Sequence, residues 1–330
     1  MTRPALNVPR TAVVIIVHGR HRHLQRQLLS LDGLVTADSI LHVVVAMADS
    51  DVAQLVARAA DGPVDVAHRV VVELPVGEDA ELPLAAARNV GASAGLEWGA
   101  DLLVFLDVDC LAHPDLITDY RAATHGGRAS TASRDPEPTH NPDAGRASAA
   151  SRDPVDLTGP ILWCGQVSYL PPLPAGVADY PLIDLDSWSA PHSARPVLPP
   201  GAIQLTRDVR LFWSLNFAVT ARDWHASGGF HPGYRGYGGE DTDFARGVAA
   251  RGGGLGWIGG AAAFHQHHPT SSPPWQHLAA IVRNAHVFRD RWGTFPMEGW
   301  LEAFAAAGAI DYRPDDGILE LTADPPPPHD

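Results

Sequence analysis

Two groups of residues have the types and spacing that suit a metal site. Asp107-Val108-Asp109 follow the apolar stretch 102–106, and carboxylates at the end of a buried strand can hold a divalent cation that also bridges a diphosphate. Phe264-His265-Gln266-His267-His268 end another apolar stretch, and imidazole is a good ligand for Mn²⁺ or Zn²⁺. His265 is the first-choice ligand because it follows Phe264 directly, and His267 and His268 are second choices. A solvated acidic turn and a His-rich surface turn are the structural alternatives.

A third group suits proton transfer. Gly236-Tyr237-Gly238-Gly239-Glu240-Asp241-Thr242-Asp243 places flexible glycines and an aromatic ring before three carboxylates. An aromatic ring such as Tyr237 can stack on a sugar, and a carboxylate that faces the sugar can take a hydroxyl proton as a general base. Helix capping explains one of the acids but not all three. The spacing does not fit an EF-hand calcium loop.

Polar residues also follow the first two expected strands. Arg20, together with His18, supplies donor groups suited to a phosphate or a uracil, and a solvated basic loop is the alternative. Asp49 suits a nucleobase or ribose contact, or is a plain turn residue. Arg88 opens a helix beside the sheet and is either structural or reaches the same crevice.

The elements that position these groups alternate between strand and helix. Apolar runs predict strands at 11–17, 40–47, 66–74, 102–106, 161–170 and 211–220. Helical spacing predicts helices at 24–31, 52–60, 84–98, 222–227 and 241–251. This order predicts an α/β fold with a mostly parallel central sheet flanked by helices. Because ligands collect at the carboxyl ends of such strands, loops 18–23, 48–51 and 107–109 are expected to converge on one crevice.

Composition excludes several functions. The chain has 330 residues and a formal net charge of −14, and all 24 basic residues are Arg. Without Lys, neither a Schiff base nor a Walker-type phosphate lysine is available. The negative charge argues against nucleic acid as a partner. Two cysteines without a disulfide or zinc spacing predict a cytoplasmic protein, and the sequence shows no secretory signal or integral membrane segment.

The chain is expected to form one domain over 11–290. A flexible insertion at 124–156 interrupts it, because the Ser/Ala/Arg/Pro-rich unit 127–136 recurs almost unchanged at 145–154. The end of the chain, 307–330, is expected to be a poorly ordered tail.

Several motifs, taken in order, resemble those of a known family. They are His18-Gly19-Arg20-His21-Arg22-His23-Leu24, Ala87-Arg88-Asn89-Val90-Gly91, Phe105-Leu106-Asp107-Val108-Asp109, Gly228-Gly229-Phe230 and the block 236–243. This order resembles that of the inverting glycosyltransferases with the GT-A fold. The block 236–243 resembles the C-terminal motif of the β-1,4-galactosyltransferases, and Phe264-His265-Gln266 is similar to the metal-binding segment of bacterial family-two enzymes such as chondroitin polymerase.

The resemblance implies a GT-A-type fold and a metal-dependent reaction. A hexose, galactose or a sugar like N-acetylhexosamine, would pass with inversion from a nucleotide-diphosphate sugar, UDP-linked, to a saccharide or another hydroxyl acceptor. Mn²⁺ or Mg²⁺ would be the cofactor. The rival hypotheses are a metal-dependent phosphohydrolase of nucleotide sugars and a non-catalytic sugar-nucleotide-binding protein.

The resemblance also assigns roles to individual residues. Asp241 would be the general base. The remaining roles are metal binding by Asp109, His265 and Asp107, donor binding by Arg20, His18, Asp49, Arg88 and Asp107, and acceptor binding by Glu240, Tyr237 and Gly239.

Overall fold

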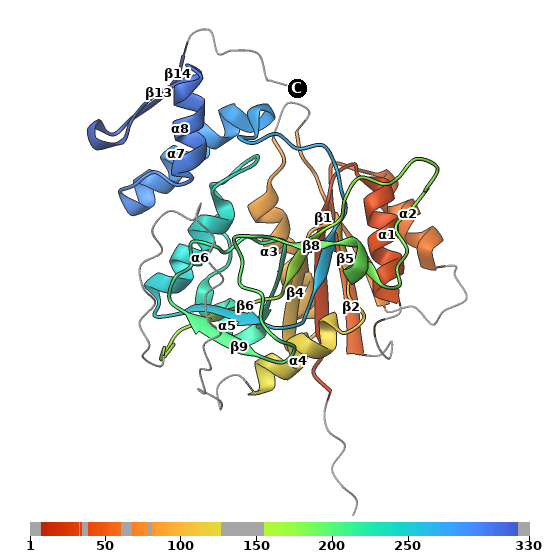
Figure 1. The fold of residues 1–330 in the computed structure, drawn as a ribbon. Helices are drawn as coiled ribbons and strands as arrows, with labels where there is room; N and C mark the ends of the chain where they lie inside the picture. The colour runs from red at the N-terminus through yellow and green to blue at the C-terminus, as the bar shows by residue number, and fades with distance from the viewer. Residues whose placement is uncertain are drawn as a thin grey trace, which may run out of the picture.

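The computed structural model describes residues 8–32, 34, 39–60, 68–77, 81–126 and 155–322 (Figure 1). The predicted insertion, 124–156, lies almost entirely outside these residues. The strands are β1 (Thr11–Val17), β2 (Ile40–Met47), β3 (His68–Leu74), β4 (Leu102–Leu106), β5 (Cys110–Ala112), β6 (Ile161–Cys164), β7 (Val167–Tyr169), β8 (Ala190–Pro191), β9 (Ile203–Thr206), β10 (Asn216–Thr220), β11 (Gly254–Ile258), β12 (Ala263–His265), β13 (Ile310–Arg313) and β14 (Ile318–Leu321). The helices are α1 (His21–Asp32), α2 (Asp51–Ala60), α3 (Leu84–Glu97), α4 (Leu116–Gly126), α5 (Ala221–Ser227), α6 (Glu240–Ala250), α7 (Leu278–Trp292) and α8 (Glu298–Ala306).

A large sheet forms the centre of the fold, in the order β3-β2-β1-β4-β10-β6-β11-β9. β3, β2, β1 and β4 run parallel, as do β6 and β11, whereas β10 and β9 run antiparallel to their neighbours. The predicted mostly parallel α/β sheet is therefore confirmed. The strand expected at 211–220 begins only at Asn216, and the one expected at 161–170 is divided into β6 and β7.

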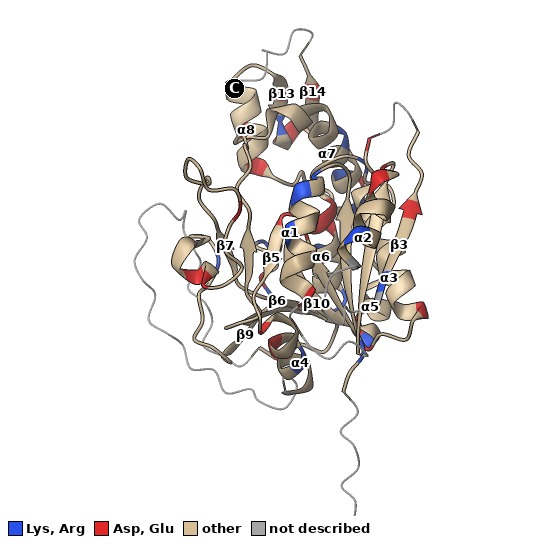
Figure 2. Cartoon of the chain, turned by 90° about the vertical axis from the view of Figure 1, so that its right-hand side faces the viewer, with Lys and Arg blue, Asp and Glu red and all other residues tan. Residues whose placement is uncertain are grey.

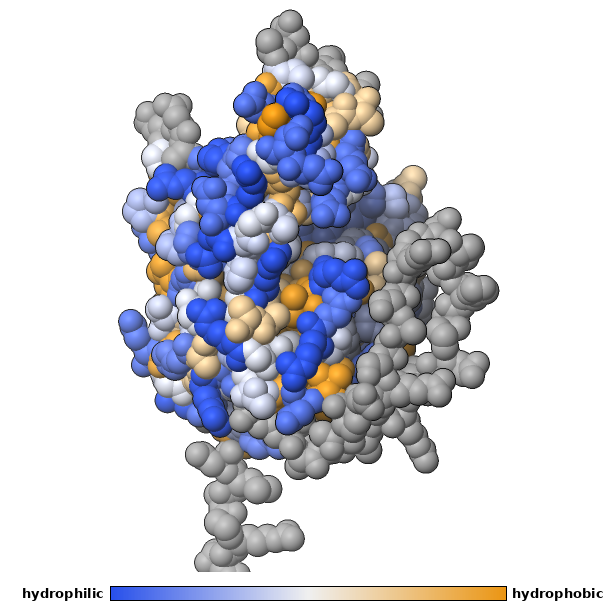
Figure 3. All heavy atoms as spheres, turned by 90° about the vertical axis from the view of Figure 1, so that its left-hand side faces the viewer, coloured by the Kyte–Doolittle hydropathy of each residue, from blue (hydrophilic) through white to orange (hydrophobic). Residues whose placement is uncertain are grey.

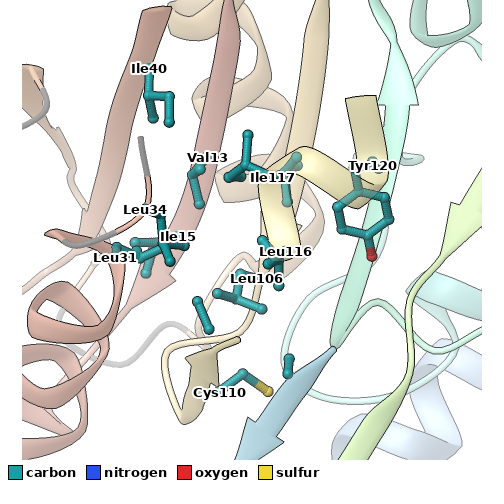
Figure 4. Packing of buried hydrophobic residues seen from close by; sticks show 14 of the residues in the cluster. Val13, Ile15, Leu31, Leu34, Ile40, Leu106, Cys110, Leu116, Ile117 and Tyr120 are labelled. Atoms are coloured by element: carbon teal, nitrogen blue, oxygen red, sulfur yellow. The ribbon is translucent and has the colours of Figure 1, made fainter. Parts of the chain in front are cut away.

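Strand β1 is buried along its whole length because apolar layers cover both faces of the sheet. Val13 and Ile15 belong to the core under α1, α2 and α4, part of which is drawn in Figure 4. Their neighbours Ala12 and Val14 belong to the opposite core, which includes residues of α3, α5 and α6. This alternation explains why the strand is continuously apolar.

Two glycines let α3 lie close to β1. A Cβ atom added at Gly91 would lie 2.4 Å from Cγ1 of Val14, and one added at Gly95 would lie 2.7 Å from Cβ of Ala12. Any larger residue at these positions would push the helix away from the sheet. The close approach of α3 to β1 also places Arg88, one turn before Gly91, beside the end of β4.

A second sheet, in the order β5-β12-β7-β8, brings distant segments to the carboxyl end of β4. β12 pairs with β5 so that His265 lies opposite Cys110, and with β7 so that His265 is also in register with Tyr169. The histidine segment therefore lies next to Asp109 despite the long separation in sequence.

Residues 278–321 form a layer of their own, drawn in blue in Figure 1. Ile310 of β13 and Leu319 of β14 are buried in a cluster with residues of α7 and α8. The expectation of a poorly ordered tail from 307 is therefore wrong for 307–322. Strands β13 and β14 pair as a hairpin. The few apolar residues of this hairpin pack on α7 and α8. Residues 323–330 lie outside the described part of the chain.

The surface of the described chain is mixed in character. Acidic and basic positions are interspersed on the face shown in Figure 2. On the face shown in Figure 3, apolar atoms lie in small groups among hydrophilic side chains. Among the described residues, no helix combines the length and the apolar character that crossing a bilayer requires.

Candidate active site

The ends of β1, β2 and β4 meet, as the sequence predicts. The backbone N–H of Gly19 donates to Oδ2 of Asp49 at 2.7 Å, and the ring of His21 contacts the same oxygen at 2.9 Å. Arg20 has a left-handed backbone (φ 49°) and places its Nη1 2.7 Å from Oδ2 of Asp109. His18 is exposed and contacts a β2 carbonyl, that of Met47, through Nδ1 at 2.7 Å. Loops 18–23, 48–51 and 107–109 therefore converge.

Asp109, His265 and His268 form a group with metal-ligand geometry. One ligand atom from each lies within 4.8 Å of the other two. Nε2 of His265 is 3.5 Å from Oδ1 of Asp109, and Nε2 of His268 is 3.3 Å from Oδ2. The backbone N–H of Gln266 donates to the Asp109 carbonyl at 2.7 Å, which fixes the two segments side by side. We call these three residues the triad.

The surroundings of Asp109 and His265 favour the protonation states that suit metal binding. Burial disfavours an ionised Asp109, but a hydrogen bond to His268 and the charges of His265 and Arg20 lower its pKa to about 2. Burial lowers the pKa of His265, which favours the neutral imidazole. A carboxylate and neutral imidazoles are the forms that bind metal ions.

Arg88 joins the two acidic motifs. Its guanidinium donates to Oδ1 of Asp107 through Nη2 and to Oε1 of Glu240 through Nη1, both at 3.3 Å. Arg88 is only 5% exposed. Asp107 is thus held by Arg88, outside the triad, and Arg88 links the turn that carries Asp107 and Asp109 to the helix that carries Asp241.

The two carboxyls that face Arg88 keep their protons more readily than usual. Burial raises the pKa of Asp107 to about 6, with a further upward contribution from Asp109, and Arg88 opposes the shift. Burial and the charge of Asp241 raise the pKa of Glu240 to about 7, again against Arg88. Burial also raises the pKa of Asp241.

Replacing Glu240 by Gln is expected to change how the free energy of unfolding depends on pH. The folded protein holds the Glu240 proton to about pH 7, whereas the unfolded chain releases it near the ordinary value. The carboxyl therefore stabilises the fold at acid pH, and this contribution is lost as the pH rises through about 7. The amide does not titrate, so the variant should gain stability relative to wild type between about pH 5 and pH 8 in urea unfolding. A difference that stays constant across this range would contradict the expectation.

The glycine loop before α6 is held from both ends. Oε2 of Glu240 accepts the N–H of Gly238 at 3.1 Å, and Gly238 and Gly239 have φ values of 100° and 90°. From α7, the buried Asn284 donates through Nδ2 to the carbonyls of Arg235 at 2.9 Å and Gly238 at 2.8 Å. Hydrogen bonds from both sides therefore fix the path of this loop.

Tyr237 lies in an aromatic group at this loop. Its ring is 39% exposed and stacks on His277 at 4.7 Å and on Trp300 of α8 at 6.0 Å, measured between ring centroids. The C-terminal layer therefore contributes to the surface beside the acidic block.

Asp241 is less constrained than its neighbour Glu240. It receives the backbone N–H of Thr242 at 2.7 Å and the Thr242 hydroxyl at 3.4 Å, both at Oδ1. Both oxygens of Glu240, by contrast, are engaged by Arg88 and Gly238. The raised pKa of Asp241 and its Oδ2, which neither Thr242 bond uses, suit proton transfer.

One family model and several solved structures resemble this chain. A family model described as the N-terminal domain of galactosyltransferase matches residues 203–268, which contain the acidic block and two residues of the triad. The fold is similar to that of S. aureus TarS 1-349, with a TM-score of 0.51 and 11% identity, over 84% of this chain and 64% of that chain. The predicted GT-A-type fold is confirmed.

Two further solved structures give lower TM-scores. TarS in complex with UDP gives a TM-score of 0.48 at 11% identity, covering 84% of this chain and 64% of that one. Mannosyltransferase PcManGT from Pyrobaculum calidifontis, in complex with GDP-Man and Mn²⁺, gives 0.49 at 16% identity, covering 92% and 76%. The chain thus spans just under two thirds of the TarS chain. No curated protein matches the sequence.

Two residues that support the candidate site belong to no sequence motif. Gln27 of α1 is fully buried and donates through Nε2 to the carbonyls of Asp107 at 2.7 Å and Cys110 at 3.0 Å, so it holds the turn that carries Asp109. Asn284 holds the glycine loop. Both are polar residues on buried helix faces, and an amide among apolar neighbours is the signal that reveals them.

Replacing Asn284 by Ala is expected to lower the free energy of unfolding by about 1–3 kcal/mol, because the buried Gly238 carbonyl loses its donor. Urea unfolding measures the loss. A change at an exposed position of the same helix that does not contact the loop, Asp290→Ala, should cost less. Equal losses in both variants would show that the hydrogen bonds of Asn284 contribute little.

Proposed function

We propose that the protein is a metal-dependent inverting glycosyltransferase. It moves a hexose, galactose or a sugar like N-acetylhexosamine, from a UDP-linked donor to a hydroxyl group of a saccharide. The observation that carries the proposal is the linkage through Arg88 of two acidic centres, one beside the triad and the other beside Asp241. Transfer from a nucleotide-diphosphate sugar needs these two centres: one for the leaving diphosphate and one for the attacking hydroxyl.

The donor side rests on the triad and Arg20. One carboxylate and two imidazoles form a donor set that fits Mn²⁺, whose ligand preferences include both nitrogen and oxygen. When bound, the metal supplies positive charge that stabilises the departing diphosphate. Arg20 is 40% exposed in its side chain and lies against Asp109, so its free donors are available to a phosphate. Asp49 and His18 line the same end of the sheet, where a nucleoside would lie.

The acceptor side rests on Asp241. In a single displacement, the acceptor oxygen forms a bond to the anomeric carbon while the bond from that carbon to the diphosphate oxygen breaks. Asp241 takes the hydroxyl proton from the face opposite the leaving group, so the configuration inverts. Tyr237, Gly239 and Glu240 surround the acceptor, and Glu240 and Arg88 position the loop.

Titration calorimetry of the protein with UDP, GDP and TDP, each with and without Mn²⁺, tests the donor side. We expect binding of UDP that depends on Mn²⁺, and loss of this dependence in Asp109→Ala, because the triad loses its only carboxylate. His125→Ala changes an exposed histidine on α4 and should bind as wild type does. Binding of no nucleotide with metal, or unchanged binding in Asp109→Ala, would contradict the proposed donor site.

Product analysis separates this function from nucleotide-sugar hydrolysis. With UDP-galactose and Mn²⁺, a transferase should release UDP faster when saccharide acceptors are added, and the new glycosidic bond should have inverted configuration. Release of sugar or sugar phosphate that is indifferent to every acceptor would instead favour the phosphohydrolase.

A further inference from the structure

Arg195 is a buried cation whose charge has no acidic partner in the described part of the chain. It follows β8, is 7% exposed, and donates through Nη2 to the Trp213 carbonyl at 2.9 Å. Its Nε and Nη1 atoms are buried and have no hydrogen-bond partner among the residues that the structure describes. No Asp or Glu of the described ranges forms an ion pair with it. Burying a guanidinium in this way is unfavourable unless an anion completes the site.

A small cavity adjoins Arg195. It measures about 10 Å³, close to the least space that one water molecule needs, and its lining includes Gln166, His192 and Trp257. Burial and the charge of Arg195 lower the pKa of His192, so the imidazole is neutral at pH 7 and Arg195 is the one cation among the lining residues. A single oxygen atom fits this space, and a negatively charged oxygen fits its charge.

A row of aromatic rings connects the cavity with the triad. Tyr169 stacks on His265 at 4.8 Å, and the ring of His192 lies 5.5 Å from that of Tyr169. Trp213 meets His192 at 4.7 Å, and the guanidinium of Arg195 lies 4.9 Å from the centre of the Trp213 ring. Tyr169 is 37% exposed, and aromatic faces of this kind are suited to sugar rings. The cavity therefore lies at the end of a surface that starts at a triad residue.

We propose that the Arg195 cavity binds one oxygen of a carboxylate group, and that an acidic saccharide lying across Tyr169, His192 and Trp213 carries this carboxylate. The first half, the binding of a carboxylate oxygen, is argued only from the unpaired guanidinium of Arg195 and the cavity beside it. The second half rests on the proposed function, because it makes the acidic saccharide a substrate of the transfer site. Arg195 then distinguishes acidic from neutral sugars.

Thermal unfolding at constant ionic strength tests both halves. Sodium formate is the free carboxylate, sodium glucuronate is the acidic sugar, and glucose and sodium chloride are the controls. Formate and glucuronate should raise the Tm saturably, by about 2–4 °C, whereas glucose and chloride should not. Arg195→Met should remove the rise, and Arg210→Met, at an exposed arginine paired with Asp208, should keep it.

Each outcome decides part of the proposal. A rise with formate but not with glucuronate supports a carboxylate site and overturns the acidic saccharide. The proposed carboxylate site is wrong if neither compound raises the Tm, or if Arg195→Met shows the same rise as the wild type. The cavity would then hold only water. Should Arg195→Met fail to fold, tryptophan fluorescence of the wild-type protein reports the same titrations, because Trp213 and Trp257 lie against the guanidinium. In that measurement a saturable change with glucuronate and none with glucose supports the proposal, and equal changes overturn it.

Failure here is distinguishable from failure of the proposed function. Binding of UDP with Mn²⁺ depends on the triad, so it should be unchanged in Arg195→Met. Loss of that binding in wild type would overturn the transferase, while a response to formate would still identify the carboxylate site.

Discussion

Asp241→Asn is expected to lower kcat by about 10²–10⁴-fold, the usual contribution of a positioned general base. The amide keeps the size of the side chain and can still accept the Thr242 N–H, but it cannot take the acceptor proton. Calorimetric binding of UDP with Mn²⁺ should be unchanged, because Asp241 is not part of the triad. Initial rates with UDP-galactose and a saccharide acceptor measure the effect.

The matched control is Asp290→Asn, which changes an exposed aspartate on α7 and should retain wild-type kcat. The pH profile adds a second readout. Because burial raises the pKa of Asp241, the wild-type rate should fall as the medium is acidified through that raised value. An Asp241→Asn protein with full turnover would exclude this residue as the base.

Arg88→Met is expected to cost about 3–5 kcal/mol in the free energy of unfolding, as for other buried ion pairs that lose one partner. The substitution leaves Asp107 and Glu240 buried without their shared cation. Both carboxyls are protonated at acid pH, so the loss should be smaller near pH 5 than near pH 8, where the wild type keeps both ion pairs and the variant must bury unpaired charge or hold both protons. Urea unfolding at several pH values measures it.

An exposed arginine gives the comparison. Arg313→Met on β13 should change the free energy of unfolding by no more than about 0.5 kcal/mol, as is usual for surface substitutions. A loss of unfolding free energy in Arg88→Met as small as that in Arg313→Met, or one that does not vary with pH, would show that Arg88 does not connect the two acidic centres.

The fold was largely predictable because its strands are local and continuously apolar. Strands at 11–17, 40–47 and 102–106 appear at the predicted positions, and the motif residues lie at their carboxyl ends. The hairpin at 310–321 was not predicted, since each strand has few apolar residues and is stabilised by packing on α7 and α8. Such short strands carry little periodicity.

The site was less predictable where its partners are far apart in sequence. Choosing between His267 and His268 requires the path of the chain after β12, which brings Nε2 of His268 toward Asp109. Arg88 was left between a structural and a crevice role, because its partner Glu240 is 152 residues away. Asn284 lies on a helix with no motif, and only the tertiary structure shows which carbonyls it meets.

The hydrogen bonds of Asn284 also determine when the glycine loop can reach its final structure during synthesis. The ribosome delivers β1 to β4 and Asp109 early, while the glycine loop waits for a donor that is made 46 residues after Gly238. Helix α7, in turn, contacts the later strand β14, because the His286 ring lies 2.8 Å from the Leu319 carbonyl oxygen. In a nascent chain, the glycine loop can therefore gain its hydrogen bonds to Asn284 only after α7 has been made.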